Sequence, residues 1–138
     1  MAAHPDPGGI SAQDATLVGK GKELFDSVGC RACHALTPDE VATPLGAGKD
    51  FAPNLGNVAQ KESGRFIYWW IKNPRGWNPK SRMPDLRLTD DEARAIASYL
   101  LSLSTPPPAD QAVTPAVLED PQLAEQGKAI VRKYGCYG

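Results

Sequence analysis

The sequence has little of what marks membrane, nucleic-acid-binding or disulfide-rich proteins. No apolar run in the 138 residues approaches the roughly 18 to 20 residues that a membrane-spanning helix needs. The formal net charge is only −1, which gives no reason to expect a nucleic-acid partner. An export signal has a basic start followed by an apolar stretch, and the first residues of this sequence have neither. Cysteine is scarce and odd in number: Cys30, Cys33 and Cys136 cannot all pair, and they are not spaced like a secreted disulfide scaffold.

Apolar residues recur at helical spacing in four segments, and none alternates convincingly with the period of a strand. The pattern therefore predicts an all-α fold. Thr89 with Glu92 three residues later forms a capping box, and Asp120 followed by Pro121 is a typical helix start. The Pro- and Gly-rich stretch 36–58 is predicted to be loop with at most short turns, and residues 74–88 are predicted to be loop. The predicted helices run over residues 17–29, 63–73, 89–103 and 121–134.

The composition divides the chain into four parts. Residues 1–13 are rich in Pro, Gly and Ala and predict a flexible N-terminal segment. Residues 14–103 carry three of the helices and are predicted to form one domain. Residues 104–120 are a Pro-rich, semi-extended linker, and residues 121–138 begin a second, truncated domain.

The second domain is predicted from an internal repeat. A shift of 106 positions brings the segment 17–32 onto 123–138, and the apolar positions match in kind. A coincidental amphipathic helix would not be expected to repeat Gly-Lys and Gly-Cys in register. Gly138 aligns with Ala32, so a second Cys-His would fall directly after it, and we expect the sequence to be a piece of a longer, two-domain protein. The identical pairs are Leu17 and Leu123, Gly21 and Gly127, Lys22 and Lys128, Gly29 and Gly135, Cys30 and Cys136.

The motif that carries chemistry is C-x-x-C-H at Cys30, Cys33 and His34, the attachment signal of c-type haem. Two thiols three residues apart on a tight turn can form thioethers with both vinyl groups of one porphyrin, and the adjacent imidazole can then ligate the iron. A zinc site is disfavoured because His34 directly beside Cys33 cannot easily share a tetrahedron with both cysteines. A thioredoxin-type pair would follow a strand, whereas a helix precedes this one.

The order of helix, C-x-x-C-H, loop, helix, methionine loop and capped helix resembles a class I cytochrome c over residues 14–103. The resemblance implies that the first helix crosses the last through a small residue and an aromatic, which Gly21 and Phe25 fit, against Tyr99 and Leu100. It also implies that Pro53, in APNL, offers its carbonyl to the free nitrogen of His34. Met83, in the segment WIKNPRGWNPKSRMP, then stands where the distal ligand belongs.

Met83 can also be weighed from its own surroundings. It lies in a Pro-bounded loop beside polar residues, so it is badly placed as an ordinary core residue, although a gap-filling methionine is the alternative. His4 is the other candidate sixth ligand, but it lies in the N-terminal segment and is more simply a surface residue. Among the clustered aromatics Trp70 is expected to contact the haem, and Trp77 to approach its propionates, while plain helix packing is the alternative for both.

Charge is unevenly spread in spite of the neutral total. Residues 65–87 carry six basic side chains and one acid, Asp85, whereas residues 104–126 carry four acids and no base. A basic collar beside an exposed haem edge would attract a redox partner protein with an acidic docking face, and an ordinary solvated surface is the alternative. The basic residues are Arg65, Lys72, Arg75, Lys80, Arg82 and Arg87.

Together these features predict an electron-transfer domain with one haem c per complete domain and with His34 and Met83 as axial ligands. With both axial positions filled, outer-sphere electron transfer is favoured over chemistry on a small-molecule substrate. Two alternatives stay open: a haem enzyme or gas-binding domain in which Met83 dissociates, and a haem-free, zinc-binding helical module. The resemblance implies a periplasmic or otherwise extracytoplasmic location, and a two-haem protein or a membrane-anchored respiratory complex as the setting.

Overall fold

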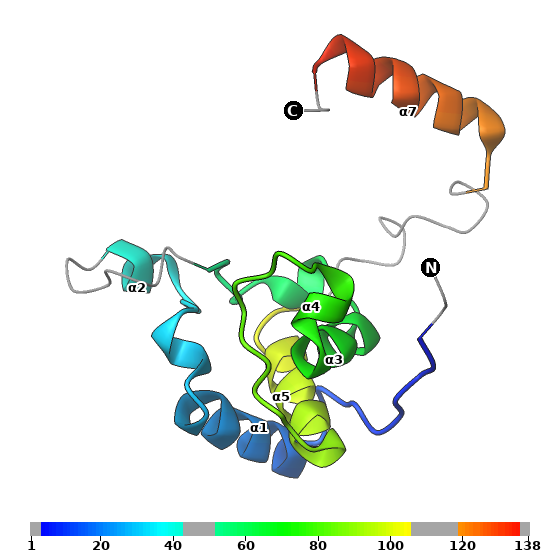
Figure 1. Cartoon of the computed structure of the whole chain (residues 1–138). Coiled ribbons are helices and arrows are strands. Elements are labelled where there is room, and N and C mark those ends of the chain that lie inside the picture. The colour runs from blue at the N-terminus through cyan, green and yellow to red at the C-terminus, as the bar shows by residue number, and fades with distance from the viewer. Residues whose placement is uncertain (1–3, 43–51, 106–118, 136–138) are drawn as a thin grey trace. The chain divides into compact units, whose positions relative to one another are not determined.

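The computed structural model describes residues 4–42, 52–105 and 119–135 (Figure 1). Within these ranges every regular element is helical, which confirms the all-α prediction. Contacts group the chain into two units, one up to residue 106 and one from residue 107 onward. No helix of the described ranges is both long enough and apolar enough to span a bilayer. The α-helices are α1 (Ala15–Ser27), α2 (Pro38–Ala42), α3 (Gly64–Lys72), α4 (Pro74–Trp77), α5 (Asp90–Ser102) and α7 (Pro121–Lys133), and the 3-10 turns are η1 (Cys30–Ala32) and η2 (Val58–Gln60).

The helices of the first unit begin at side chains that satisfy their free backbone N–H groups. Asp14 accepts hydrogen bonds from the first turn of α1, and Ser63 accepts one from the backbone of Phe66 at the start of α3. At α5 the capping box between Thr89 and Glu92 is formed in both directions, as predicted. Helix α1 ends before Gly29, whose φ of 95° is a backbone conformation that glycine adopts without strain.

Helix α4 was not predicted, because residues 74–88 were expected to be loop. The side chain of Asn73 accepts a hydrogen bond from the backbone of Gly76, and Pro74 occupies the first helical position. Asn as the cap and Pro at the first position is a recognised helix start. Pro74 therefore both ends α3 and begins a single turn that carries Trp77.

The core of the first unit is built around α5, which contacts both α1 and α3 (Figure 1). Ala93 and Ala97 are fully buried, and their small side chains let the neighbouring helices approach α5 closely. On α3 the fully packed face consists of Ile67, Tyr68 and Ile71. The other buried members of the cluster are Phe25, Leu88, Ile96, Tyr99 and Leu100.

The crossing of α1 and α5 depends on Gly21. A Cβ added there would fall on the carbonyl oxygen of Ala95 and lie 2.8 Å from Cβ of Tyr99, so that only glycine lets the two backbones touch. One turn further on, the rings of Phe25 and Tyr99 pack at a centroid distance of 5.6 Å. Gly21 and Phe25 on α1 thus meet Tyr99 on α5, as the resemblance implied.

The second unit is described from Glu119 to Gly135 and consists of α7, capped by Asp120 as predicted. Three of its large apolar residues are exposed: Leu123 by 43%, Ile130 by 55% and Tyr134 by 70%. A Cβ added at Gly127 would meet nothing within 4 Å. Cys136, the third cysteine and the expected start of a second motif, lies outside the described residues.

Replacing Gly21 by alanine should destabilise the first unit by about 1–3 kcal/mol, because the new methyl group has to push α1 away from α5. Gly19→Ala is the matched control on the same helix, since its Cβ would meet nothing within 4 Å. It should be neutral or stabilise the helix by up to about 1 kcal/mol. Urea unfolding followed by circular dichroism measures both variants, and equal effects would contradict the close crossing.

Candidate haem-attachment site

The C-x-x-C-H motif lies on the turn that directly follows α1. After Gly29 the chain enters η1, and the carbonyl of Cys30 accepts hydrogen bonds from the backbone N–H groups of Cys33 and His34, at 3.2 and 3.0 Å. Both thiols are free and half-buried. Because α1 is fixed by its crossing with α5, the motif begins at a defined point of the fold.

An ion-pair bracket that the sequence did not predict holds this turn. A guanidinium nitrogen of Arg31 lies 2.6 Å from the carboxylate of Glu40, at the start of α2, and the second oxygen of Glu40 accepts a hydrogen bond from the backbone of Leu36 at 2.8 Å. Arg31 also lies 3.7 Å from the carboxylate of Asp26. Arg31, one of the two unspecified positions of the C-x-x-C-H motif, therefore connects α1, η1 and α2.

The imidazole of His34 is oriented by the segment that begins at Pro53. Its Nδ1 lies 2.7 Å from the carbonyl oxygen of Pro53. A carbonyl can only accept, so this contact requires the proton on Nδ1 and leaves the lone pair of Nε2 available to a metal. The backbone N–H of Leu55 donates to the carbonyl of Ala35 at 2.9 Å, which pins this segment beside the motif.

Burial raises the pKa of the Cys30 thiol above its ordinary value. A hydrogen bond from its own backbone works against this shift, and the charge of Asp26 and the neighbouring thiol of Cys33 reinforce it. The shift favours the protonated thiol over the thiolate, which is the form that attacks disulfides.

Met83 is held by two hydrogen bonds. Its backbone N–H donates to the hydroxyl of Ser81 at 3.2 Å, and the indole N–H of Trp70 donates to its sulfur at 3.2 Å. Both Trp70 and Met83 are half-buried against the core. The sulfur keeps a second lone pair, so this contact still allows it to bind a metal.

The clustered aromatics form a connected row. Phe66 packs against Trp70 at 5.8 Å and edge-on against Trp77 at 5.1 Å between ring centroids. The ring of His4 lies 4.9 Å from those of both Trp69 and Trp77. The sequence predicted the cluster, but it gave no sign that His4 belongs to it.

The structure thus brings the expected site residues together in groups: Cys30, Cys33 and His34 on one turn, His34 with Pro53, and Trp70 with Met83. Among the described residues no group of three or more His, Cys, Asp or Glu side chains is arranged to hold a metal ion. The donors present are two free thiols, an imidazole with a free Nε2 and a thioether. This set fits a covalently attached haem.

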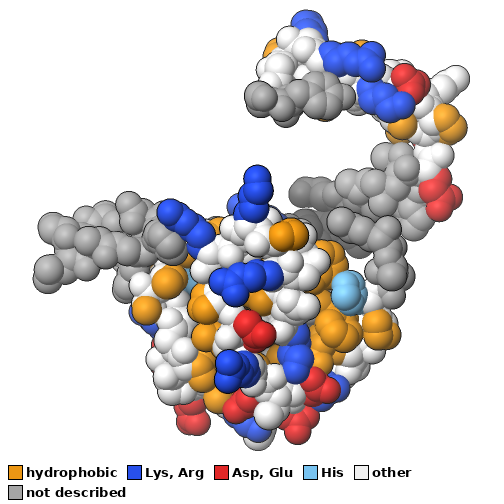
Figure 2. All heavy atoms as spheres, in the orientation of Figure 1, with side chains coloured by type: hydrophobic (Ala, Val, Ile, Leu, Met, Phe, Trp, Pro, Cys, Tyr) orange, Lys and Arg blue, Asp and Glu red, His pale blue; other side chains and the backbone are white. Residues whose placement is uncertain are grey.

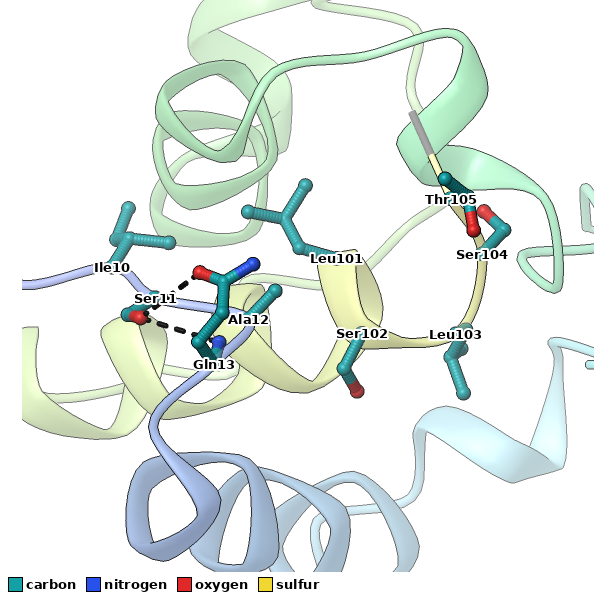
Figure 3. Close-up of a pocket in the computed structure, with 9 residues that line it drawn as sticks. All are labelled: Ile10, Ser11, Ala12, Gln13, Leu101, Ser102, Leu103, Ser104 and Thr105. Carbon is teal, nitrogen blue, oxygen red and sulfur yellow. Dashed lines mark hydrogen bonds between the residues drawn. The ribbon is translucent and has the colours of Figure 1, made fainter. Parts of the chain in front are cut away.

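A separate pocket of about 510 Å³ lies between the N-terminal segment and the end of α5 (Figure 3). None of the expected site residues lines it. The hydroxyl of Ser104 is buried there without a hydrogen-bond partner in the described part of the chain. The lining residues are Ile10, Ser11, Ala12, Gln13, Leu101, Ser102, Leu103, Ser104 and Thr105.

Comparison with known proteins agrees with this chemistry. The family model for cytochrome c matches residues 18–104. Cytochrome c-551 of Stutzerimonas stutzeri is 33% identical over 103 residues, which cover 70% of this chain and 88% of that protein. Two nitric oxide reductase subunits also match, one of S. stutzeri at 33% identity over 87 residues and one of Paracoccus denitrificans at 32% over 95 residues. These two matches cover 59% and 62% of this chain but only 54% and 58% of the relatives, so the chain spans little more than half their length. No solved structure matches significantly.

The helical fold and the haem-attachment motif define a c-type cytochrome. The chain belongs to the cytochrome c family. Its cofactor is haem c, attached covalently, and its role is electron transfer.

Proposed function

We propose that this chain is a single-electron carrier whose haem is bound through Cys30 and Cys33 and ligated by His34 and Met83. The observation that carries the proposal is the contact of His34 Nδ1 with the Pro53 carbonyl, which leaves Nε2 free to bind a metal. His34 follows directly on the turn that carries two free thiols. Cys30 and Cys33 would hold the haem through two thioether bonds, each formed by addition of an S–H to a vinyl group, which needs no oxidant.

When bound, the haem supplies a one-electron iron couple. The residues of the chain determine how that couple behaves. The Pro53 carbonyl orients His34 and increases its basicity, and Trp70 holds the sulfur of Met83. Met83 as a ligand would raise the reduction potential relative to two histidines, and it would occupy the position that a substrate would otherwise need.

Met83→Ala should lower the reduction potential, abolish the methionine-to-iron charge-transfer band of the oxidised protein, and open the iron to carbon monoxide. Met83→His is the matched variant, since it should lower the potential without opening the iron. Potentiometry and carbon monoxide difference spectra of protein matured with an export leader measure these effects. The parent chain kept in the cytoplasm should stay free of haem. An unchanged potential in Met83→Ala, or carbon monoxide binding to the parent, would favour a ligand-binding domain instead.

We further propose that this chain is extracytoplasmic. We also propose that it donates electrons within a larger oxidoreductase, of which it is a domain or a subunit. Two of the relatives are by their names subunits of an enzyme of this kind, nitric oxide reductase. A collar of exposed basic residues supports docking of an acidic partner. Figure 2 shows Lys and Arg side chains on the face that carries α3 and α4 in Figure 1. Lys72 is half-buried and lies 2.9 Å from the carboxylate of Asp90, so the collar is defined by exposure alone: its members are Arg65, Arg75, Lys80, Arg82 and Arg87.

Reversing two charges of this collar, in Arg75→Glu with Lys80→Glu, should slow reduction by anionic ferrocyanide about tenfold at low ionic strength. Reduction by cationic hexaammineruthenium should become faster. Lys20→Glu with Lys22→Glu makes the same charge change on the exposed side of α1 and is the control. Stopped-flow rates with both reductants measure the effect, which salt should remove. Equal rates for the two double variants would contradict a directed collar.

We also propose that residues 121–138 begin a second cytochrome c domain, which makes the native protein a two-haem carrier. The in-register repeat supports this, and so do the exposed apolar residues of α7 where α1 is packed. The gene sequence directly after the codon for Gly138 tests the proposal. It should encode Cys-His, followed by a loop and a methionine segment like that of residues 53–84. A stop codon or an unrelated sequence there would contradict it.

A further inference from the structure

Residues 4–11 lie along α3 and α5 and are tied to them at several points. The indole N–H of Trp69 donates to the carbonyl of Pro5 at 2.8 Å, and Nε of Arg94 donates to the carbonyl of Pro7 at 3.2 Å. The backbone N–H of Ser11 donates to the buried hydroxyl of Ser98 at 3.0 Å. We call this segment the N-terminal strap. Its composition predicted a flexible segment, yet it is held by three long-range hydrogen bonds.

The first described residue of the strap, His4, is placed between two indole rings. Its imidazole lies 4.9 Å from Trp69 at an interplanar angle of 33°, and 4.9 Å from Trp77 at 30°. Trp69 belongs to α3 and Trp77 ends α4, so one ring bridges the two helices. The side chains of both indoles are thereby held at a fixed spacing.

From Trp77 the contacts continue to the sulfur of Met83. Trp77 meets the edge of Phe66 at 5.1 Å, and Phe66 packs against Trp70, one turn further along α3, at 5.8 Å. The indole N–H of Trp70 then donates to the sulfur of Met83 at 3.2 Å. A contiguous row of rings therefore joins the strap to the methionine.

We propose that the N-terminal strap positions Met83: His4 acts as a wedge that braces Trp77 and Phe66, and these keep the Trp70 indole on the methionine sulfur. His4 and Trp70 are positioning residues and not ligands. The proposal rests on the proposed role of Met83 as the axial ligand, and it adds the part of the chain that holds this ligand in place.

Methionine needs such positioning because its side chain is flexible. Its side chain has three rotatable bonds, and ordering such a side chain costs conformational entropy. A hydrogen bond to one lone pair of the sulfur fixes the side chain while the other lone pair stays available. A methionine fixed in this way competes better for the iron, so that a foreign ligand has to displace a pre-organised group.

The test is a titration of the oxidised, haem-loaded chain with imidazole, which competes with Met83 for the iron. Trp70→Phe keeps the ring but removes the N–H, and it should raise the apparent imidazole affinity about fivefold, the value of one ordinary hydrogen bond. His4→Ala should raise it by a smaller factor, and His4→Phe should restore the parent value because a flat ring is retained. In the Trp70→Phe background, His4→Ala should have no further effect.

Gln60→Ala, at an exposed position outside the strap, is the control and should leave the affinity unchanged. Urea unfolding of each variant separates a change at Met83 from loss of the fold. The strap proposal is overturned if Met83→Ala raises the imidazole affinity while Trp70→Phe and His4→Ala leave it at the parent value. Additive effects of His4→Ala and Trp70→Phe would also overturn it, because contacts along one row must couple.

A second readout does not depend on Met83 being the ligand. In nitrogen-15-labelled, reduced protein the indole proton of Trp70 should exchange with solvent faster in His4→Ala than in the parent or in His4→Phe. If Met83→Ala leaves the imidazole affinity unchanged, the proposed ligation is wrong, and the exchange rate alone then decides on the strap. An unchanged rate in His4→Ala would show that the strap does not hold Trp70.

Discussion

The contact of two backbones at Gly21 and Ala95 is the constraint on which the rest of the first unit depends. It allows α1 to lie directly on α5, and α5 in turn packs against α3. Three residues after α1 ends, the C-x-x-C-H turn begins, so the crossing determines where Cys30 and Cys33 lie. On another helix of the same core, α3 presents Trp70 to Met83. Both parts of the candidate site are therefore positioned by helices that pack against α5. Helix α5 itself carries none of the candidate site residues.

The site itself is held mainly through backbone carbonyls and through side chains that sequence motifs do not mark. His34 is oriented by the carbonyl of Pro53, and the motif turn is bracketed by Arg31 and Glu40. A carbonyl is an acceptor in every residue, so a sequence has no means of showing which one is used. Such contacts are nevertheless fixed by geometry, because Leu55 and Ala35 bring the two loop segments together through their own backbone hydrogen bond. A few residue types supply the chemical groups of the candidate site, and the fold determines how these groups are oriented.

This division explains how far the sequence could be used for prediction. The caps at Ser63, Thr89 and Asp120 and the stop at Gly29 were all predictable, since each depends on neighbours within a few residues. The single turn of α4 differs from the predicted loop because Pro74 is typical of a helix end, whereas Asn73-Pro74 is also a start signal. The pairing of His34 with Pro53 was expected from the family resemblance and not from spacing. The N-terminal strap had no signal at all: it lacks periodicity, and apart from His4 and Ile10 it is held through its backbone.

Helices α1 and α7 show that similar sequences can be packed differently. Gly21 and Gly127 occupy equivalent positions of two similar sequences, yet a Cβ at the first would fall on Ala95 and one at the second would meet nothing. Leu24 is half-buried against the core, whereas its counterpart Ile130 is 55% exposed. A glycine in an exposed helix costs about 1 kcal/mol relative to alanine and is of use only where another backbone comes close. A glycine in this register therefore marks a helix crossing only where a partner helix lies against it, as α5 lies against α1.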